Sequence, residues 1–459
     1  MSEKDTQVTK EGGAKFGSTF GYIMVAAGAA VGLGNVWKFP YLCYENGGGA
    51  FMIAFVVVGL LVAYPMVKVE TCIGRFGGGD AVSCYEKINP KWGFIGWIAN
   101  LCTLLINMFY VVVGGWVLKY AVHYIISGDF SAGTEVFFTN FTTAPIEPLI
   151  WSTILLAFVS IFLLFGITGT VEKMLKVMMP ALFIFLIICG IWACIAIPGA
   201  TAGLSFYFIP DFSQFTFTTF GAVCTQVLFS VGIGWGIFTT LGANVPKGNN
   251  VSRDSILIVL CDALVAIVAG FVVIPSALAF GTDLAAGPRL VFEVMAGVFA
   301  MLPGGRILGA LFFVALLFAV ISSLFTFFEI GMRTFEIKLG LGRKKGVLVV
   351  ALIILAGNIL VSLGFGMLSW VQLPWPSFGG LEHYGFYDWI DCFTAYVLLP
   401  LGVLLTALFV VKGWGFVKYE QEMVQGGAKP LGKFEKFLII VVVPIAMIMV
   451  LLYVFGVLH

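Results

Sequence analysis

The segment from Ala26 to Tyr41 reads AAGAAVGLGNVWKFPY, and it decides how the chain is interpreted. It lies in an apolar run long enough to span a membrane, yet it contains the glycines Gly28, Gly32 and Gly34. An asparagine, a lysine and a proline follow directly after them. Glycine costs about 1 kcal/mol relative to alanine inside a helix, and proline costs more. The segment therefore predicts a membrane helix that is interrupted near its centre.

The composition places this segment in a membrane protein. Of 459 residues, 60% are hydrophobic and 11% are charged, and the mean hydropathy is +1.04. Soluble domains carry about 25% charged residues, so that class is excluded. The net charge of +1 provides no basic surface for nucleic acid. The nine cysteines and three histidines lack the spacing of a metal site or a disulfide framework, and we assign them no role.

Eleven apolar runs are long enough to cross a bilayer, which takes about 17–25 residues. They predict an all-α polytopic membrane protein with about eleven transmembrane helices. A further stretch, 285–299, is predicted to form a short amphipathic helix outside the bilayer. The eleven runs are 20–42, 49–73, 94–126, 149–166, 171–197, 217–241, 255–281, 305–336, 346–365, 388–411 and 436–457.

Lysine and arginine are distributed unevenly between the two sides of this topology. With a cytoplasmic amino terminus, all of the 25 Lys and Arg residues except Lys38, Lys119, Arg289 and Arg306 fall on the cytoplasmic side. Such an excess is typical of cytoplasmic loops. We therefore expect a multi-pass protein of the cell membrane, with a cytoplasmic amino terminus and an extracellular carboxy terminus.

The glycine pattern occurs again in the sixth run. Gly232, Gly234 and Gly236 stand in the centre of QVLFSVGIGWGIF. Close packing of two helices through small residues is one explanation. Glycines at every second position, however, do not line one face of a helix. The sixth run is therefore also predicted to be broken.

The two interrupted runs occupy matching positions if the chain consists of two similar halves. We predict one transporter domain, 1–459, with a first repeat at 19–197, a second repeat at 217–411 and an additional helix at 436–457. The predicted topology makes the repeats inverted, and broken helices in inverted repeats mark a binding site at the bilayer midplane. Freed carbonyls favour a cation there, and freed amides favour a carboxylate.

Longer stretches of the chain carry a family resemblance: GYIMVAAGAAVGLGNVWKFPYLCYENGGGAFMIAF, YPMVKVETCIGRF, QVLFSVGIGWG and FAVISSLF. They resemble the first helix with its following turn, and the second, sixth and eighth helices, of the neurotransmitter:sodium symporter family. The resemblance covers helices one to ten in order. It implies the leucine-transporter-type fold, with helices one and six unwound at the midplane, and uptake of amino acids or amines coupled to sodium.

The resemblance implies two sodium sites, the second of which involves helices one and eight. This second site would consist of the carbonyls of Gly28, Val31 and Ala319 and the hydroxyls of Ser322 and Ser323. Five oxygens without a formal charge suit Na⁺. Two serines in a helix can instead bond back to the preceding turn, which is the alternative for this pair.

The first sodium site would consist of the Ala30 carbonyl, Asn35, Ser230 and Asp262. An acid within an apolar run is costly and is a functional candidate for that reason. The alignment of this helix with the family can shift by one residue. The alternative to a sodium ligand is that Asp262 faces the surface near the end of the helix. Chloride-dependent members of the family have neutral residues around this point. A built-in carboxylate therefore implies that transport needs no chloride.

The implied substrate site lies between helices one, three, six and eight. Amine transporters of the family carry an aspartate where this chain has Gly32, so the substrate should bring its own carboxylate and be an amino acid. Its apolar wall implies a neutral, hydrophobic L-amino acid. Gly232 would give room for a larger aliphatic or aromatic side chain, although Trp235 would reduce that room. The full predicted set is Ala29, Ala30, Leu33, Gly34, Ile106, Tyr110, Phe229, Ser230, Gly232, Trp235, Ser323 and Phe327.

The resemblance also implies an outer gate formed by Lys38, Tyr110, Phe229 and Asp391. The family usually has arginine in place of Lys38. Lysine lacks the two-pronged hydrogen bonding of arginine, so this gate should be looser or bridged by water.

Two further positions concern helix six and the inner end of the protein. Glu70 would accept hydrogen bonds from the broken backbone of helix six, and a rim acid near Lys68 and Arg75 is the alternative. The family's Arg-x-x-Trp pattern before helix one is absent, because Gly13 and Phe16 occupy those places. We expect a different inner latch and consider a pair of Lys15 with Glu336.

These inferences predict a sodium/amino-acid symporter that works by alternating access, with membrane lipid and a hydrophobic amino acid as its partners. The expected ions are two Na⁺ and no chloride. An amino-acid-binding membrane receptor or scaffold without transport is the alternative. An enzyme is not expected, since the sequence contains no nucleophile–base set, and no nucleic acid is expected as a partner.

Overall fold

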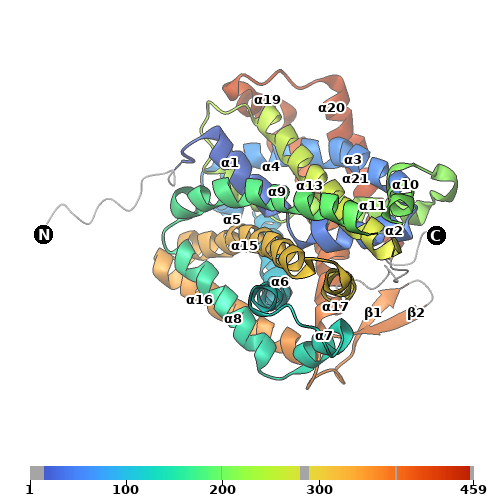
Figure 1. The fold of residues 1–459 in the computed structure, drawn as a ribbon. Helices are drawn as coiled ribbons and strands as arrows, with labels where there is room; N and C mark the ends of the chain where they lie inside the picture. The colour runs from blue at the N-terminus through green and yellow to red at the C-terminus, as the bar shows by residue number, and fades with distance from the viewer. Residues whose placement is uncertain (1–14, 198, 280–288, 378–379, 455–459) are drawn as a thin grey trace, which may run out of the picture.

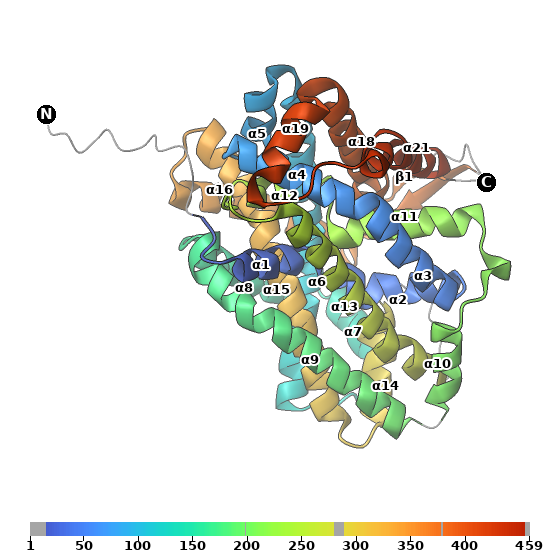
Figure 2. The same ribbon diagram turned by 90° about the horizontal axis from the view of Figure 1, so that it is seen from above.

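The computed structural model describes residues 15–197, 199–279, 289–377 and 380–454, and most of these residues are helical. The predicted amino-terminal segment 1–18 lies largely outside the described residues. The helices form one bundle, with α6 and α15 near its centre, and α19 and the β1–β2 hairpin lie on opposite sides of it (Figures 1 and 2).

The described residues of the first half of the chain form ten α-helices. Several are joined by single π-helical turns, so that α3 and α4 form one continuous helical segment from residue 49 to residue 77. The bounds are α1 (Thr19–Ala30), α2 (Phe39–Glu45), α3 (Gly49–Val58), α4 (Tyr64–Gly77), α5 (Ala81–Ile88), α6 (Phe94–Ile126), α7 (Thr134–Thr143), α8 (Glu147–Leu163), α9 (Glu172–Ala196) and α10 (Ala200–Phe208).

The second half adds a hairpin of two short antiparallel strands, in which Leu373 pairs with Tyr384. The bounds are α11 (Phe217–Val231), α12 (Ile237–Gly242), α13 (Val251–Ala279), α14 (Ala296–Met301), α15 (Gly305–Lys338), α16 (Arg343–Gly364), β1 (Leu373–Ser377), β2 (Gly380–Tyr384), α17 (Phe386–Cys392), α18 (Leu399–Phe409), α19 (Phe416–Met423), α20 (Lys433–Phe437) and α21 (Val443–Val454).

Among the described residues, eight helices are long and apolar enough to cross a membrane, and two bent helix pairs bring the number to ten. The predicted run 217–241 is divided between α11 and α12, which have 15 and 6 residues. The number eleven therefore stays a prediction. The ends of two runs, 280–281 and 455–457, lie outside the described residues, as do residues 285–288 of the amphipathic stretch. The rest of that stretch forms the helical turn Leu290–Met295 and part of α14.

Both glycine-rich segments interrupt a helix. The segments Thr19–Ala30 and Gly34–Glu45 are inclined to each other by 55°. In the sixth run, α11 ends at Val231 and α12 begins at Ile237. Left-handed backbone in that gap suits glycine, which has no Cβ to clash. The residues with positive φ there are Gly232 (+80°), Gly234 (+83°) and Gly236 (+76°).

Large aliphatic side chains are exposed along the outer faces of several helices. In water such a surface would promote aggregation, whereas lipid accepts it without cost. The faces therefore agree with a multi-pass membrane protein. Examples are Ile150, Ile154 and Ile161 of α8, Ile184, Ile188 and Ile191 of α9, Leu348, Leu352 and Ile359 of α16, and Ile445 and Ile448 of α21.

Candidate functional site

The break in the first helix faces an acidic side chain from α13. Asn35 donates to the Asp262 carboxylate at 2.7 Å and to its backbone carbonyl at 3.1 Å. Ser230 of α11 lies 3.0 Å from both carboxylate oxygens. The Oδ1 atom of Asn35 accepts the Gly32 amide at 2.9 Å, so the same side chain also holds the break open. Asp262 has no exposed surface, so its side chain points into the bundle and not toward lipid.

The charge of Asp262 is not balanced by a basic side chain within the described part of the chain. Its hydrogen-bond partners are the neutral groups of Asn35 and Ser230. A buried carboxylate without a counter-charge is strongly disfavoured. The arrangement is therefore suited to a small cation, and the predicted site-1 residues Asn35, Ser230 and Asp262 are brought together. Ala30 ends α1 close by in the chain and is buried.

The second group of predicted residues surrounds the hydroxyl of Ser323. Its Oγ atom lies 3.3 Å from the Gly28 carbonyl, 3.3 Å from that of Val31 and 3.1 Å from that of Ala319. Ser322 lies 2.9 Å from the same Ala319 carbonyl, so the back-bonding alternative is present in the geometry too. A hydroxyl has one hydrogen and cannot donate to three carbonyls at once. The surplus of acceptors is suited to a monovalent cation.

The predicted carboxylate contact lies beside these oxygens. Tyr110 of α6 accepts a hydrogen bond from the Leu33 amide at 3.0 Å. A Cβ atom added to Gly32 would lie 2.5 Å from the Tyr110 hydroxyl and 2.9 Å from the Ser323 hydroxyl. Position 32 therefore has no space for a side chain, including the aspartate of amine transporters. A Cβ atom on Gly34 would lie 2.9 Å from the ring of Phe229, so this glycine is also required by close approach.

Aromatic rings form the wall of the predicted substrate site. The Trp235 ring lies 5.5 Å from that of Phe229 and 4.8 Å from that of Phe327, measured between centroids. The room expected at Gly232 stays a prediction. A Cβ atom there would lie 2.6 Å from the end of the Ile237 side chain, a neighbour for which the sequence offered no signal. The remaining wall residues, Ala29 and Ile106, are buried on α1 and α6.

Three residues of the predicted outer gate lie in contact. Lys38 Nζ lies 3.3 Å from one oxygen of Asp391 and 4.4 Å from the ring centroid of Phe229. A cavity of about 180 Å³ lies against this pair, and it includes Tyr110 and Asp388 in its lining. One lysine contact in place of two arginine contacts leaves the pair less constrained.

Glu70 contacts the broken sixth helix and not the neighbouring basic groups. Its carboxylate accepts the Gly234 amide at 2.7 Å. Lys68 and Arg75 are occupied elsewhere, by Glu435 and Glu422. The geometry therefore corresponds to the first of the two alternatives for Glu70.

Two polar residues at the breaks were missed by the sequence analysis. Gln226 of α11 donates to the Gly34 carbonyl at 2.9 Å. Thr103 of α6 donates to the Trp235 carbonyl at 2.8 Å. Both are polar side chains within apolar runs, which was the signal available for finding them.

The expected inner pair of Lys15 and Glu336 is wrong. Lys15 Nζ instead donates to the Ala243 carbonyl at 2.8 Å, and the Phe16 amide donates to the Asn244 carbonyl at 3.1 Å. The Phe16 side chain is buried. Gly13, the other altered position of the family pattern, lies outside the described residues.

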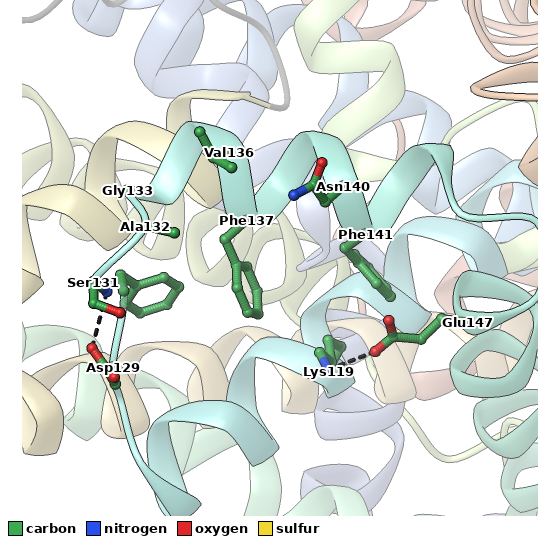
Figure 3. Close-up of a pocket in the computed structure, with 11 residues that line it drawn as sticks. Lys119, Asp129, Ser131, Ala132, Gly133, Val136, Phe137, Asn140, Phe141 and Glu147 are labelled. Carbon is green, nitrogen blue, oxygen red and sulfur yellow. Dashed lines mark hydrogen bonds and ion pairs between the residues drawn. The ribbon is translucent and has the colours of Figure 1, made fainter.

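A separate cavity of about 300 Å³ lies beside α7, away from the predicted site (Figure 3). Lys119 and Glu147 form an ion pair at 2.6 Å at one end of it. At the other end Asp129 accepts the Ser131 amide at 2.9 Å. Since these charged groups already have partners, we assign no ligand to this cavity.

Comparison with known proteins is consistent with this geometry. The model of the sodium:neurotransmitter symporter family matches residues 14–129 and 146–458. The chain belongs to this family. An uncharacterized sodium-dependent transporter of Bacillus subtilis (strain 168) is 32% identical over 97% of this chain and 98% of its own length. An uncharacterized sodium-dependent transporter of Haemophilus influenzae is 34% identical, over 85% of this chain and 88% of its own.

A solved structure shares the fold of this symporter. The crystal structure of MhsT in complex with L-phenylalanine superposes with a TM-score of 0.88 at 31% identity, covering 96% of this chain and 100% of MhsT. The leucine-transporter-type fold implied by the resemblance is thus confirmed, and so is the family. The protein is a sodium-coupled membrane transporter and not an enzyme.

Proposed function

We propose that this symporter takes up a neutral, hydrophobic L-amino acid together with Na⁺ and without chloride. The observation that carries the proposal is the buried Asp262 carboxylate at the break of the first helix. Its contacts with Asn35 and Ser230 are neutral, so a sodium ion would balance its charge. Because the negative charge is part of the protein, no chloride ion is needed to supply it.

Two sodium ions are proposed, at the two groups of oxygens described above. The first would bind Asp262, Asn35, Ser230 and the Ala30 carbonyl. The second would bind the oxygens gathered around Ser323, where several carbonyls share one hydroxyl hydrogen. Both groups involve the broken first helix, so ion binding and the shape of the break are coupled.

The amino-acid substrate would place its carboxylate at the amides of Leu33 and Gly34, the Tyr110 hydroxyl and the first sodium ion. The absence of space at Gly32 supports an amino acid, since an amine would need an acidic partner at this position. The complex of MhsT with L-phenylalanine supports the same substrate class. The apolar wall of Ile106 and Phe327 supports a neutral, hydrophobic side chain.

The preferred size of that side chain depends on Trp235. The Trp235 ring lies 4.8 Å from that of Phe327 between centroids, so it limits the room that Gly232 would leave for a large aliphatic or aromatic side chain. We therefore propose hydrophobic amino acids as the class, with Trp235 setting the upper limit of size.

Transport would follow alternating access between the two repeats, 19–197 and 217–411, in the cell membrane. Lys38 and Asp391, with the rings of Tyr110 and Phe229, would close the site toward the outside. Glu70 would keep the break of the sixth helix in shape by accepting the Gly234 amide.

The test is binding by the purified protein of each standard amino acid in NaCl, sodium gluconate and KCl. Binding of a few hydrophobic amino acids that needs sodium and is equal in the two sodium salts is the expected result. Binding that ignores sodium would contradict both cation sites, and binding that needs chloride would contradict the role of Asp262. Uptake into liposomes driven by a sodium gradient then separates a transporter from a receptor, which would bind without accumulating substrate.

A further inference from the structure

The first turn of α1 lies against a buried acid at the start of α9. The Gly17 amide donates to Glu172 Oε2 at 3.1 Å. A Cβ atom added to Gly21 would lie 1.9 Å from Glu172 Oε1, so α1 approaches the carboxylate more closely than any other residue type would allow. The Glu172 side chain is 3% exposed. A charged group is thus buried beside the amino-terminal end of α1.

The charge of Glu172 has a defined set of partners. Its Oε1 atom lies 2.7 Å from the ammonium of Lys176, one turn later in α9. The first turn of α1 presents free amides, which attract a carboxylate. Ser18 already accepts the Gly21 amide at 3.0 Å, and Glu172 takes the amide of Gly17 just before it. One carboxylate therefore completes the cap of α1 and joins α1 to α9.

The same face of α9 continues to the proposed second sodium site. A Cβ atom on Gly28 would lie 3.2 Å from the Met179 sulfur and 3.0 Å from Ser322 Cβ. Met179 is two turns after Glu172 in α9. Helix α9 therefore lies along α1 from the first turn of α1 to Gly28, whose carbonyl is proposed to bind sodium (Figure 2). Because α1 is one continuous helix of 12 residues that ends at Ala30, a displacement of its first turn also moves Gly28.

We propose that Glu172 is a positioning residue for transport, which keeps α1 against α9 and so closes the second sodium site on the side where α1 begins. The contacts of Lys15 and Phe16 with residues 243 and 244 hold the preceding chain, but they involve backbone groups and no ion pair. Release of the Glu172 carboxylate would allow α1 to leave α9, exposing Met179 and separating the Gly28 carbonyl from the serines. The inference rests on the proposed function for the link to sodium.

The test uses Glu172→Gln, which keeps an acceptor for the Gly17 amide and removes the charge. Reporter cysteines are placed at Met179, in the α1–α9 contact, and at Asp388, in the outer cavity. Each reporter is reacted with a charged thiol reagent in KCl, and protein without the reporter gives the background from native cysteines. Reaction at position 179 should become roughly tenfold faster and reaction at 388 slower, as expected when a charge-assisted contact that favours one state is lost. High sodium should reverse part of the change.

The matched control is Glu420→Gln, which removes the ion pair with Lys436 at 3.7 Å, away from α1, and should leave both rates unchanged. Unchanged rates in Glu172→Gln at an unchanged melting temperature would overturn the proposal. If Glu172→Gln does not fold, Glu172→Asp tests the same contact, because the shorter side chain keeps the charge but draws it away from the Gly17 amide; unchanged rates there also overturn the proposal. The labelling rates in KCl do not depend on sodium binding. The proposed function fails by a different observation, namely amino-acid binding by the unaltered protein that does not need sodium. The two failures can therefore be told apart.

Discussion

The two broken helices contain similar glycine patterns, but the glycines serve different purposes. In the sixth helix Gly232, Gly234 and Gly236 all have positive φ, so the backbone itself requires glycine. In the first helix Gly32 and Gly34 have no such conformation. They are required because Tyr110, Ser323 and Phe229 come too close for a Cβ atom. One break is therefore defined by backbone conformation and the other by what packs against it.

The polar groups at the two breaks differ in the same way. The sixth helix is held by Glu70, which accepts the Gly234 amide, and by Thr103, which donates to the Trp235 carbonyl. The first helix faces the uncompensated Asp262 charge and the crowded carbonyls at Ser323. We infer that changes at the sixth break mainly affect folding, whereas changes at the first mainly affect ligand binding.

The largest effect is expected for Gly234→Ala. A left-handed conformation costs a residue with a Cβ about 1–2 kcal/mol, and the new methyl group would lie 2.9 Å from the Leu399 carbonyl. With overpacking, the loss of stability should be about 3 kcal/mol. Thermal melting of the purified protein measures it. The control is Gly248→Ala, where a Cβ atom meets nothing within 4 Å. Equal melting of the two variants would show that the sixth break does not depend on glycine conformation.

The next effect concerns Asp262→Asn, which keeps the side-chain shape and removes the charge. Sodium affinity, measured by titrating amino-acid binding, should fall roughly a hundredfold, or about 2.8 kcal/mol. Added chloride should restore part of it, since an anion can replace the lost charge. Asp254→Asn is the control on the same helix. The Asp254 carboxylate accepts a hydrogen bond from Asn249 and lies outside the proposed sodium site, so this variant should leave the sodium affinity unchanged. Unchanged sodium affinity in the Asp262 variant would remove this residue from the site.

A smaller effect is expected for Tyr110→Phe, which removes the hydroxyl that meets the Leu33 amide. Substrate affinity should fall roughly tenfold, about 1.4 kcal/mol, because a contact to the carboxylate is lost. Equilibrium binding in saturating sodium measures this loss, and the melting temperature of the free protein should change little. A variant that binds normally but melts early would reverse the assignment and make Tyr110 a structural residue.

The smallest effect is expected for Lys38→Arg at the outer gate. Arginine can form two hydrogen bonds with Asp391 in place of the single contact at 3.3 Å. The closed state should gain about 0.5 kcal/mol, which slows substrate release by a factor of about two. Dissociation of labelled substrate measures this rate. Lys119→Arg, whose partner Glu147 lies in the separate cavity of Figure 3, should leave the rate unchanged. Faster release from the Lys38 variant would contradict a gating contact.

The helical runs were predictable because hydropathy and length determine what can lie in a bilayer. The breaks were predictable because glycine and proline disfavour a helix wherever it lies. The short helices α5, α7 and α10 and the β1–β2 hairpin were not predicted, since they lie in the connections, where no long apolar run indicates them. The family resemblance supplied the predicted site residues, but it could not give the distances between their side chains.

The sequence by itself determined that this protein spans a membrane with two interrupted helices, because composition and glycine spacing act locally along the chain. Its motifs were sufficient to predict the family, which the comparisons confirmed. The tertiary structure decided which way Asp262 points, that Tyr110 and Ser323 crowd Gly32, and that Glu172 meets the first turn of α1. Each of these contacts joins residues on different helices or depends on how a helix is rotated in the bundle, and only packing determines that rotation.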